Sequence, residues 1–309
     1  SRVDRVANYI PARKSNLNYY RAVPLFSNTN NGKFVLYKRA GIKLDDIRMD
    51  QKRHPEKLYI KKADKLAGIQ EVQAAFNKQL EEYIKRNSPK KVKDTIVAIV
   101  EETFDEPRSG NIEGLSKTIN ILVSDFANES NIVRNLLFVS NNDYTTVLHS
   151  INVMALVIGY ATHENFSLAE KKTVGLGALL HDVGKAKIDS EILSAPRKLT
   201  EIEFDKMKSH TTVGYQMLNR CKFEKPEIRL GALQHHEKID GSGYPKRLYE
   251  ISEIAQIIGI IDCYEALTND DRPYRSAIDP LEALTIIKDD VEAGKFNKRI
   301  FEKFCYSLL

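Results

Sequence analysis

Residues 175–185 read GLGALLHDVGK, and this stretch decides how the rest of the chain is interpreted. An apolar run with helix-forming character ends in a His-Asp pair, so two ionisable groups lie where a buried helix should end. Three other apolar runs begin or end in the same way: residues 149–160 (HSINVMALVIGY), 227–237 (EIRLGALQHHE) and 253–262 (EIAQIIGIID). The pattern predicts a helical domain whose ionisable side chains gather at the ends of apolar helices.

The rest of the chain shows two further sequence patterns. Residues 19–65 contain short segments rich in Val, Tyr, Phe and Ile, separated by Asn- and Gly-containing turns, as is typical of strands. From residue 66 onward, apolar residues recur at helical spacing, and breaks are expected at Pro89 and before Pro107. We therefore expect a mainly α protein, with a small β-rich (α+β) domain over residues 1–65, connecting helices over 66–130 and a helical domain over 131–309.

Composition limits the class of protein. The chain has 309 residues, 42% hydrophobic and 29% charged, which excludes a wholly disordered chain. No apolar run approaches the roughly 18–20 residues needed to cross a bilayer, and the first ten residues lack a signal-peptide core. The odd number of cysteines, without paired spacing, predicts free thiols in a reducing compartment: Cys221, Cys263 and Cys305. We expect a cytoplasmic protein without a membrane span.

Charge is distributed unevenly along the chain. Residues 1–65 carry 16 Lys and Arg against 6 Asp and Glu, whereas the whole chain has a net charge of +5. A basic segment of this kind can contact nucleic acid, an anionic membrane surface or an acidic partner. Its basic residues are not interleaved with the stacking aromatics of a nucleic-acid module. A solvated basic surface is the simpler interpretation, and no DNA or RNA partner is expected.

Seven ionisable residues form the candidate site. They are His149, His181, Asp182, His210, His235, His236 and Asp262. A lone histidine on an apolar face is usually a core residue, but so many buried imidazoles and carboxylates are costly unless they are paired or bind metal. Nitrogen and oxygen donors without a thiolate favour iron, manganese or zinc over structural zinc and iron–sulfur clusters. Seven donors exceed one ion, so we predict two divalent ions that share Asp182.

Basic residues near these ligands suit a phosphate substrate. Two ions sharing a carboxylate can hold a nucleophile and neutralise a phosphoryl group. Lys185 lies four residues after His181 and therefore on nearly the same helical face. Arg272 and Arg275 follow Asp262 and can clamp phosphate oxygens. The simpler interpretation of each basic residue is a surface charge.

The order of these motifs resembles the HD-GYP family of cyclic di-GMP phosphodiesterases, a branch of the HD phosphohydrolase superfamily. The resemblance covers roughly residues 135–309 and rests on HDVGK at 181–185, HHEKIDGSGYP at 235–245 and IDCYEALTNDDRPYR at 261–275. It implies an all-helical HD-GYP domain that hydrolyses cyclic di-GMP to linear pGpG and then GMP. Iron is the expected metal, with manganese or zinc as alternatives.

The resemblance also implies roles for single residues. All seven candidates would be metal ligands, Asp182 and Lys185 would be catalytic, and Lys185 would contact the scissile phosphate. Substrate contacts would come from Gly243, Tyr244, Arg272 and Arg275. Family members with a third metal carry a glutamate four residues before the first histidine; here that residue is Thr145, so two ions are expected. The N-terminal segment resembles small modules that precede some HD-GYP domains, which implies a regulatory role.

Other functions remain open at this point. One is an HD-superfamily nucleotide phosphohydrolase, against which the DGSGYP motif argues. Another is a catalytically weak sensor of a cyclic dinucleotide or a partner-docking module, against which the complete ligand set argues. A purely structural helical protein conflicts with the number of buried ionisable groups. A signalling protein that docks at the GYP loop and a homodimer are further expected partners.

Overall fold

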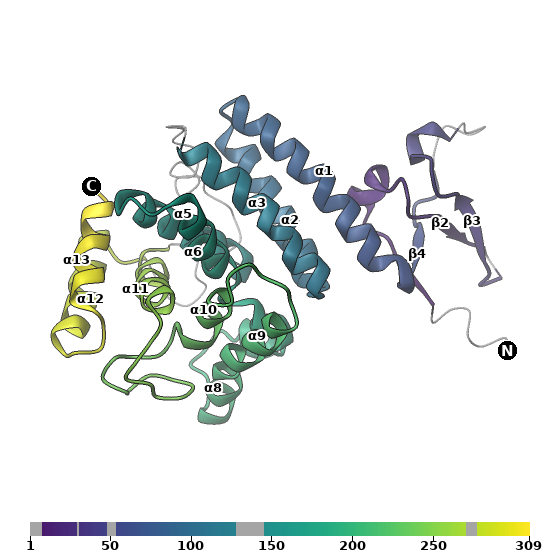
Figure 1. Ribbon diagram of the computed structural model, residues 1–309. Coiled ribbons are helices and arrows are strands. Elements are labelled where there is room, and N and C mark those ends of the chain that lie inside the picture. The colour runs from purple at the N-terminus through teal and green to yellow at the C-terminus, as the bar shows by residue number, and fades with distance from the viewer. Residues whose placement is uncertain (1–7, 30, 48–53, 128–144, 270–276) are drawn as a thin grey trace. The chain divides into compact units, whose positions relative to one another are not determined.

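The computed structural model describes residues 8–29, 31–47, 54–127, 145–269 and 277–309. Within these ranges the chain forms twelve α-helices and a four-stranded sheet (Figure 1). It divides into two compact units, residues 1–79 and residues 80–309. The expectation of a mainly helical protein with a small β-rich part is confirmed.

The first unit is built on an antiparallel sheet. Its strands lie in the order β1–β4–β2–β3, with bounds Tyr9–Pro11 (β1), Leu25–Asn28 (β2), Phe34–Lys38 (β3) and Tyr59–Lys61 (β4). Strands β2 and β3 form a hairpin in which Leu25 pairs with Lys38. Gly32 in the turn has φ of +73°, which glycine adopts at little cost. Strand β1 was not predicted, because a three-residue edge strand is too short to show an alternating pattern.

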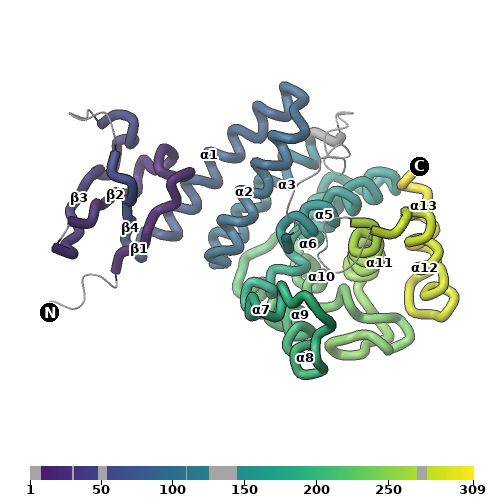
Figure 2. The backbone as a smooth tube through the Cα atoms, turned by 180° about the vertical axis from the view of Figure 1, so that it is seen from behind, coloured from purple at the N-terminus to yellow at the C-terminus, as the bar shows by residue number. Residues whose placement is uncertain are grey.

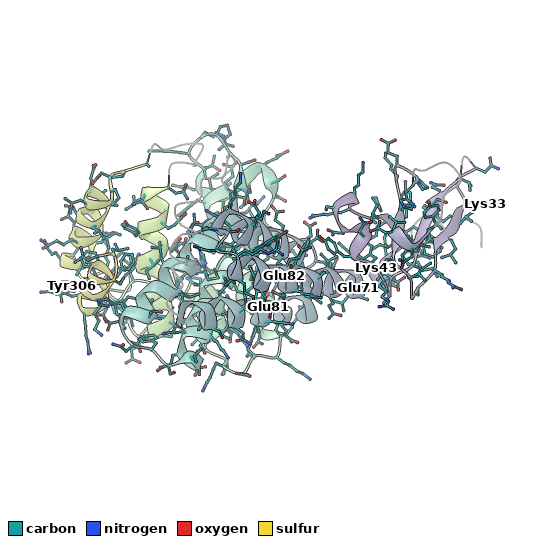
Figure 3. The ribbon with its side chains drawn as sticks, turned by 90° about the horizontal axis from the view of Figure 1, so that it is seen from above. Lys33, Lys43, Glu71, Glu81, Glu82 and Tyr306 are labelled. Carbon is teal, nitrogen blue, oxygen red and sulfur yellow. The ribbon has the colours of Figure 1, made fainter. Side chains whose placement is uncertain are left out.

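Two charged side chains form hydrogen bonds to the backbone of the loops around this sheet. Glu71 lies on helix α1 (Lys65–Lys85) and is labelled in Figure 3. One of its carboxylate oxygens accepts hydrogen bonds from the backbone N–H groups of Arg21 and Ala22, both at 2.8 Å. Lys38 is fully buried, and its ammonium donates to the carbonyls of Arg21, Arg39 and Ile42 at 3.4, 3.2 and 3.0 Å. A charge is therefore buried here with its hydrogen bonds made.

The second unit is helical. The bounds of its helices are Pro89–Asp105 (α2), Ser109–Ala127 (α3), Thr146–His163 (α5), Leu168–Leu180 (α6), Ser190–Leu193 (α7), Glu201–Lys208 (α8), His210–Asn219 (α9), Ile228–Gln234 (α10), Glu253–Thr268 (α11), Pro280–Glu292 (α12) and Lys298–Ser307 (α13). Helices α5, α6, α10 and α11 pack on one another, as Figures 1 and 2 show from opposite sides. As predicted, α2 begins at Pro89 and ends before Pro107.

The core of this unit brings the ends of several helices together. Helix α5 buries most of its residues, and Ile151, Val153 and Met154 have no exposed surface. The short 3-10 helix η4 (Val183–Lys187) packs against α9 where Gly184 meets the backbone of His210. A Cβ at position 184 would lie 2.0 Å from the carbonyl oxygen of His210, so only glycine fits. None of the helices in the described ranges is long and apolar enough to span a bilayer.

Candidate metal centre

Four helix ends and the middle of α11 bring the seven predicted residues to one place in the second unit; Asp262, expected at the end of a helix, lies inside α11 because the helix continues to Thr268. His149 lies in the first turn of α5, His181 and Asp182 follow α6, and His210 begins α9. His235 and His236 follow α10, and Asp262 lies in α11. Three groups of these side chains have ligand atoms within 4.8 Å of one another: His210, His235 and His236; His149, His181 and Asp182; and His181, His235 and Asp262. The structure therefore brings together all seven.

Asp182 lies at the centre of the cluster. Its Oδ2 atom is 3.4 Å from Nε2 of His181 and 3.6 Å from Nε2 of His149. Its Oδ1 atom faces the other side, 3.3 Å from Nε2 of His210 and 3.9 Å from Nε2 of His235. The two carboxylate oxygens thus point into two different groups of imidazoles. This is the arrangement that a carboxylate bridging two cations requires.

A second group of contacts fixes the orientation of the imidazoles. Nδ1 of His181 and of His210 lies 2.6 Å from the carbonyls of Ala178 and Met207, and Nδ1 of His235 lies 2.9 Å from that of Gly231. A carbonyl can only accept, so Nδ1 must be the donor in each ring. In the neutral imidazole the lone pair is then on Nε2, which faces Asp182. Such bonds are typical of histidines that bind metal.

Glu265 orients the imidazole of His149 through Nδ1, as the carbonyls do for the other histidines. No role was predicted for Glu265 from the sequence. Its carboxylate lies 2.5 Å from Nδ1 of His149 and also accepts from the amides of Asn152 and Asn269 at 2.9 and 2.6 Å. Asp262 lies 2.9 Å from the opposite nitrogen, Nε2. The signal was available, because Glu265 is one helical turn after Asp262 on α11 and therefore on the same face.

Two buried ligand atoms of the cluster, both hydrogen-bond acceptors, make no hydrogen bond. Oδ1 of Asp182 and Nε2 of His181 are buried and make no hydrogen bond, although both belong to almost fully buried residues. His210 is close to Oδ1, but its Nε2 carries a lone pair and cannot donate. Leaving such groups unsatisfied costs about 1–3 kcal/mol each, and more for a charged group. A divalent cation would satisfy both, so the residues present fit a metal centre.

Most of the cluster is already in the deprotonated form that binds metal. Burial lowers the pKa of His236 to about 3 and also lowers the pKa values of His210 and His235. Burial acts in the opposite direction on Asp182, but Lys185 and the neighbouring histidines hold its pKa well below the usual range. The pKa of Asp262 is also held well below the usual range: burial opposes this, and His149 outweighs it. Few protons then need to leave when a cation binds.

His149 is the exception. Burial lowers its pKa, but the carboxylates of Glu265 and Asp262 outweigh burial and raise it to about 9. Without a cation, the ring therefore carries a proton between two carboxylates. A cation at Nε2 would take the place of that proton, since both satisfy the same negative charge.

Lys185 stands at the edge of the cluster. Its ammonium lies 2.5 Å from Oδ2 of Asp182, and 23% of its side chain is exposed. It is thus the cation nearest to Asp182 among the described residues that also reaches solvent. The predicted position of Lys185 beside the ligands is what the structure shows, whereas Arg272 and Arg275 lie outside the described residues.

The GYP loop, residues 237–248, folds back onto the residues that precede it. A Cβ at Gly243 would lie 2.4 Å from the backbone nitrogen of Lys238, so the loop can approach this closely only with glycine. The backbone N–H of Tyr244 donates to the carbonyl of His236 at 3.2 Å. The two rings lie 4.7 Å apart with a tilt of 30°. Tyr244 therefore lies against a metal-ligand candidate, with its pKa raised by burial and then by Asp262 and Asp182, so the hydroxyl stays protonated.

Glu237 holds this loop in place, and sequence reasoning left it without a role. The residue is 4% exposed, and its carboxylate accepts from the backbone N–H groups of Lys246 and Leu248 at 2.6 and 2.9 Å. No sequence signal reveals this, because the partners are backbone groups that every residue type supplies. The carboxylate ties the far end of the loop to the helix end that carries His235 and His236.

Comparison with known families identifies the helical unit. A family described as the HD domain matches residues 129–300, more than half of the chain. The chain belongs to the HD domain family. With its HHEKIDGSGYP motif, this HD domain falls in the HD-GYP branch, as the resemblance predicted.

Relatives of this HD domain come from several bacteria. A cyclic di-GMP phosphodiesterase of Pseudomonas aeruginosa is 31% identical over 212 residues, which is 67% of this chain and 50% of the relative. A 3'3'-cGAMP-specific phosphodiesterase of Vibrio cholerae is 33% identical over 159 residues, 51% of this chain and 36% of the relative. The chain therefore spans half or less of the length of these curated relatives.

One solved structure shares the fold along nearly the whole chain. It is an HDG"Y"P protein from Bdellovibrio bacteriovorus, which matches 96% of this chain and 98% of its own with a TM-score of 0.61. The sequence identity is 18%, so the match concerns the fold alone.

Proposed function

We propose that the protein is a metal-dependent phosphodiesterase that hydrolyses cyclic di-GMP to linear pGpG and then to GMP. The observation that carries this proposal is the convergence of seven imidazole and carboxylate groups in one cluster, in which two buried ligand atoms make no hydrogen bond. The names of the relatives support a cyclic dinucleotide as the substrate.

Two ions, with iron as the expected metal and manganese or zinc as alternatives, suit this donor set. The two oxygens of Asp182 face different imidazole groups, which supports one ion on each side. The Thr145 hydroxyl accepts from the backbone N–H of Leu148 and caps α5, so this position supplies no carboxylate for a third ion. Bound divalent ions would supply charge neutralisation at the phosphoryl group and an activated water.

The chain's own residues would orient the substrate. Lys185 now pairs with Asp182; when a cation satisfies that carboxylate, the ammonium is free to donate to a phosphate oxygen. Tyr244 keeps its hydroxyl proton and can donate a hydrogen bond from beside His236. Gly243 allows the loop to bring Tyr244 to that place. Arg272 and Arg275 would hold the other phosphate.

Further parts of the proposal rest on the sequence. Cys221, Cys263 and Cys305 form no disulfide, which supports the cytoplasm as the place of action. We also propose a regulatory role for residues 1–65, connecting helices over 66–130, a signalling partner at the GYP loop and a homodimer.

Product analysis on anaerobically prepared protein tests the proposal. The protein loaded with iron, manganese or zinc is incubated with cyclic di-GMP, with the mixed cyclic GMP–AMP and with a panel of nucleoside triphosphates. Linear pGpG followed by GMP is expected from cyclic di-GMP. Turnover of the triphosphates alone would favour a nucleotide phosphohydrolase, and tight binding of cyclic di-GMP without product would favour a sensor; either result contradicts the proposal.

A further inference from the structure

Helix α8 stands beside the metal centre without being part of the core. None of its eight residues is buried. Its first turn is held by a capping box in which Thr200 and Glu203 bond to each other's backbone N–H groups, and Arg197 pairs with Glu203 through two 2.7 Å contacts. Its last turn is tied to the site, because the carbonyl of Met207 accepts from Nδ1 of His210. Polar contacts therefore fix this helix beside a metal-ligand candidate, and Figure 2 shows α8 next to α9, the helix that begins with His210.

Two apolar side chains of α8 are exposed to solvent. Ile202 is 73% exposed and Phe204 is 47% exposed. The ring of Phe204 lies 6.4 Å from the ring of Tyr244 at 75°, and Tyr244 lies against His236. The three rings form a row that begins at the metal centre and ends at the surface. A ring that is 47% exposed leaves part of its surface accessible for stacking on a ligand.

A cation accompanies the outer ring. The ammonium of Lys208 lies 5.1 Å from the centroid of Phe204 and pairs with Asp205 at 2.6 Å. Aromatic rings and neighbouring cations are the combination that single-stranded nucleic acids and nucleotides use for binding, since each base has a face that stacks and each phosphate has a charge.

We propose that Phe204 is the stacking platform for a nucleobase of the substrate, a role that rests on the proposed cyclic dinucleotide phosphodiesterase activity. With the scissile phosphate at the metal centre, the attached nucleoside has to extend outward past Tyr244, and Phe204 is the next ring in that direction. Stacking tolerates different bases, so Phe204 supplies affinity and leaves the choice of base to other groups.

The test compares three variants of the full-length, metal-loaded protein. Phe204→Ala should raise KM for cyclic di-GMP about 5- to 100-fold, as expected for the loss of one stacked base. Phe204→Tyr keeps an aromatic ring and should keep the wild-type KM. Ile202→Ala removes a more exposed apolar side chain of the same helix and should also leave KM unchanged. Metal content and kcat should stay unchanged in all three.

A phosphodiester without a nucleobase separates binding from structure. With methyl p-nitrophenyl phosphate, Phe204→Ala should be as active as the wild type. Equal losses on both substrates, or an unchanged KM for cyclic di-GMP, would overturn the proposal. If the wild type cleaves only the small diester, the proposed function fails instead; equilibrium dialysis of cyclic di-GMP then still tests stacking, and equal Kd values for wild type and Phe204→Ala would contradict it.

Discussion

Lys38 in the first unit and Asp182 in the second are both buried charges, and they differ in how fully their hydrogen-bonding groups are satisfied. The Lys38 ammonium donates to three backbone carbonyls. Asp182 accepts one contact from Lys185 at Oδ2, while its Oδ1 is buried without a hydrogen bond. A buried charge that is satisfied by the backbone serves the fold, whereas one that is left partly unsatisfied among imidazoles indicates a site that can bind a cation.

The largest effect should come from removing the central pair of the cluster. The double variant His181→Ala, Asp182→Ala should lose turnover of cyclic di-GMP by about 10³-fold or more, because the metal's contribution of several kcal/mol is lost. Steady-state assays of the metal-loaded proteins measure this. His163→Ala, which removes an exposed histidine at the end of α5, is the control and should keep full activity. Retained turnover in the double variant would refute the assignment of the site.

A smaller effect is expected at the loop. Glu237→Gln keeps the shape of the side chain but replaces one acceptor of a backbone N–H by an amide that cannot accept. Turnover should fall about 10- to 100-fold, in the range of residues that position a metal site, while metal content is retained. Glu250→Gln removes an exposed acid just after the same loop and should change neither. Equal activity of the two variants would show that the hydrogen bonds of Glu237 to the loop do not matter for turnover.

At Lys38 the comparison predicts loss of stability without loss of function. Lys38→Met leaves three carbonyls without their donor and should lower the free energy of unfolding by roughly 1–3 kcal/mol. Lys33→Met, at an exposed position of the same hairpin, should change it by less than about 0.5 kcal/mol. Urea unfolding measures both, and metal content should be unchanged. If Lys38→Met lowered metal content, the division between structural and functional charges would be wrong.

The metal-free protein should also show a pH dependence of its stability, and the histidines that cause it act in two separate pH ranges. The raised pKa of His149, about 9, contributes stability that is present below pH 6.5 and lost as the pH rises from about 6.5 to 9. The lowered pKa values of His210, His235 and His236 act below pH 6.5. There the unfolded chain binds more protons than the folded chain, so stability falls as the pH is lowered.

Stability in the presence of a chelator should therefore be greatest near pH 6.5. Urea unfolding at about pH 5, 6.5 and 8.5 checks the shape of this profile. Stability that rises as the pH falls from 6.5 to 5 would contradict the lowered histidine pKa values.

The sequence predicted the helices better than the contacts of the site. Apolar spacing and prolines placed α1 and α2 within a few residues of their observed bounds, because both signals are local. Most residues of the metal centre also followed from a local signal, since all but His210 lie in or directly beside one of the four apolar runs. The distances between these side chains could not be predicted, because contacts such as that of Asp262 with His149 join residues more than a hundred positions apart in the chain.

The role of Glu237 had no signal in the sequence, and the signal for Glu265 was only its position one helical turn after Asp262 on the same face of α11. Glu237 binds backbone N–H groups that carry no sequence information. Glu265 binds His149, and only the packing of α11 on α5 shows that the two meet. The position of Arg272 and Arg275 stays a prediction.

Metal analysis of anaerobically purified protein tests the central claim most directly. The wild-type chain should bind two divalent ions, and the double variant of His181 and Asp182 should bind none. The same metal content in both proteins, or a wild-type chain that remains metal-free after incubation with iron, manganese and zinc, would contradict the account.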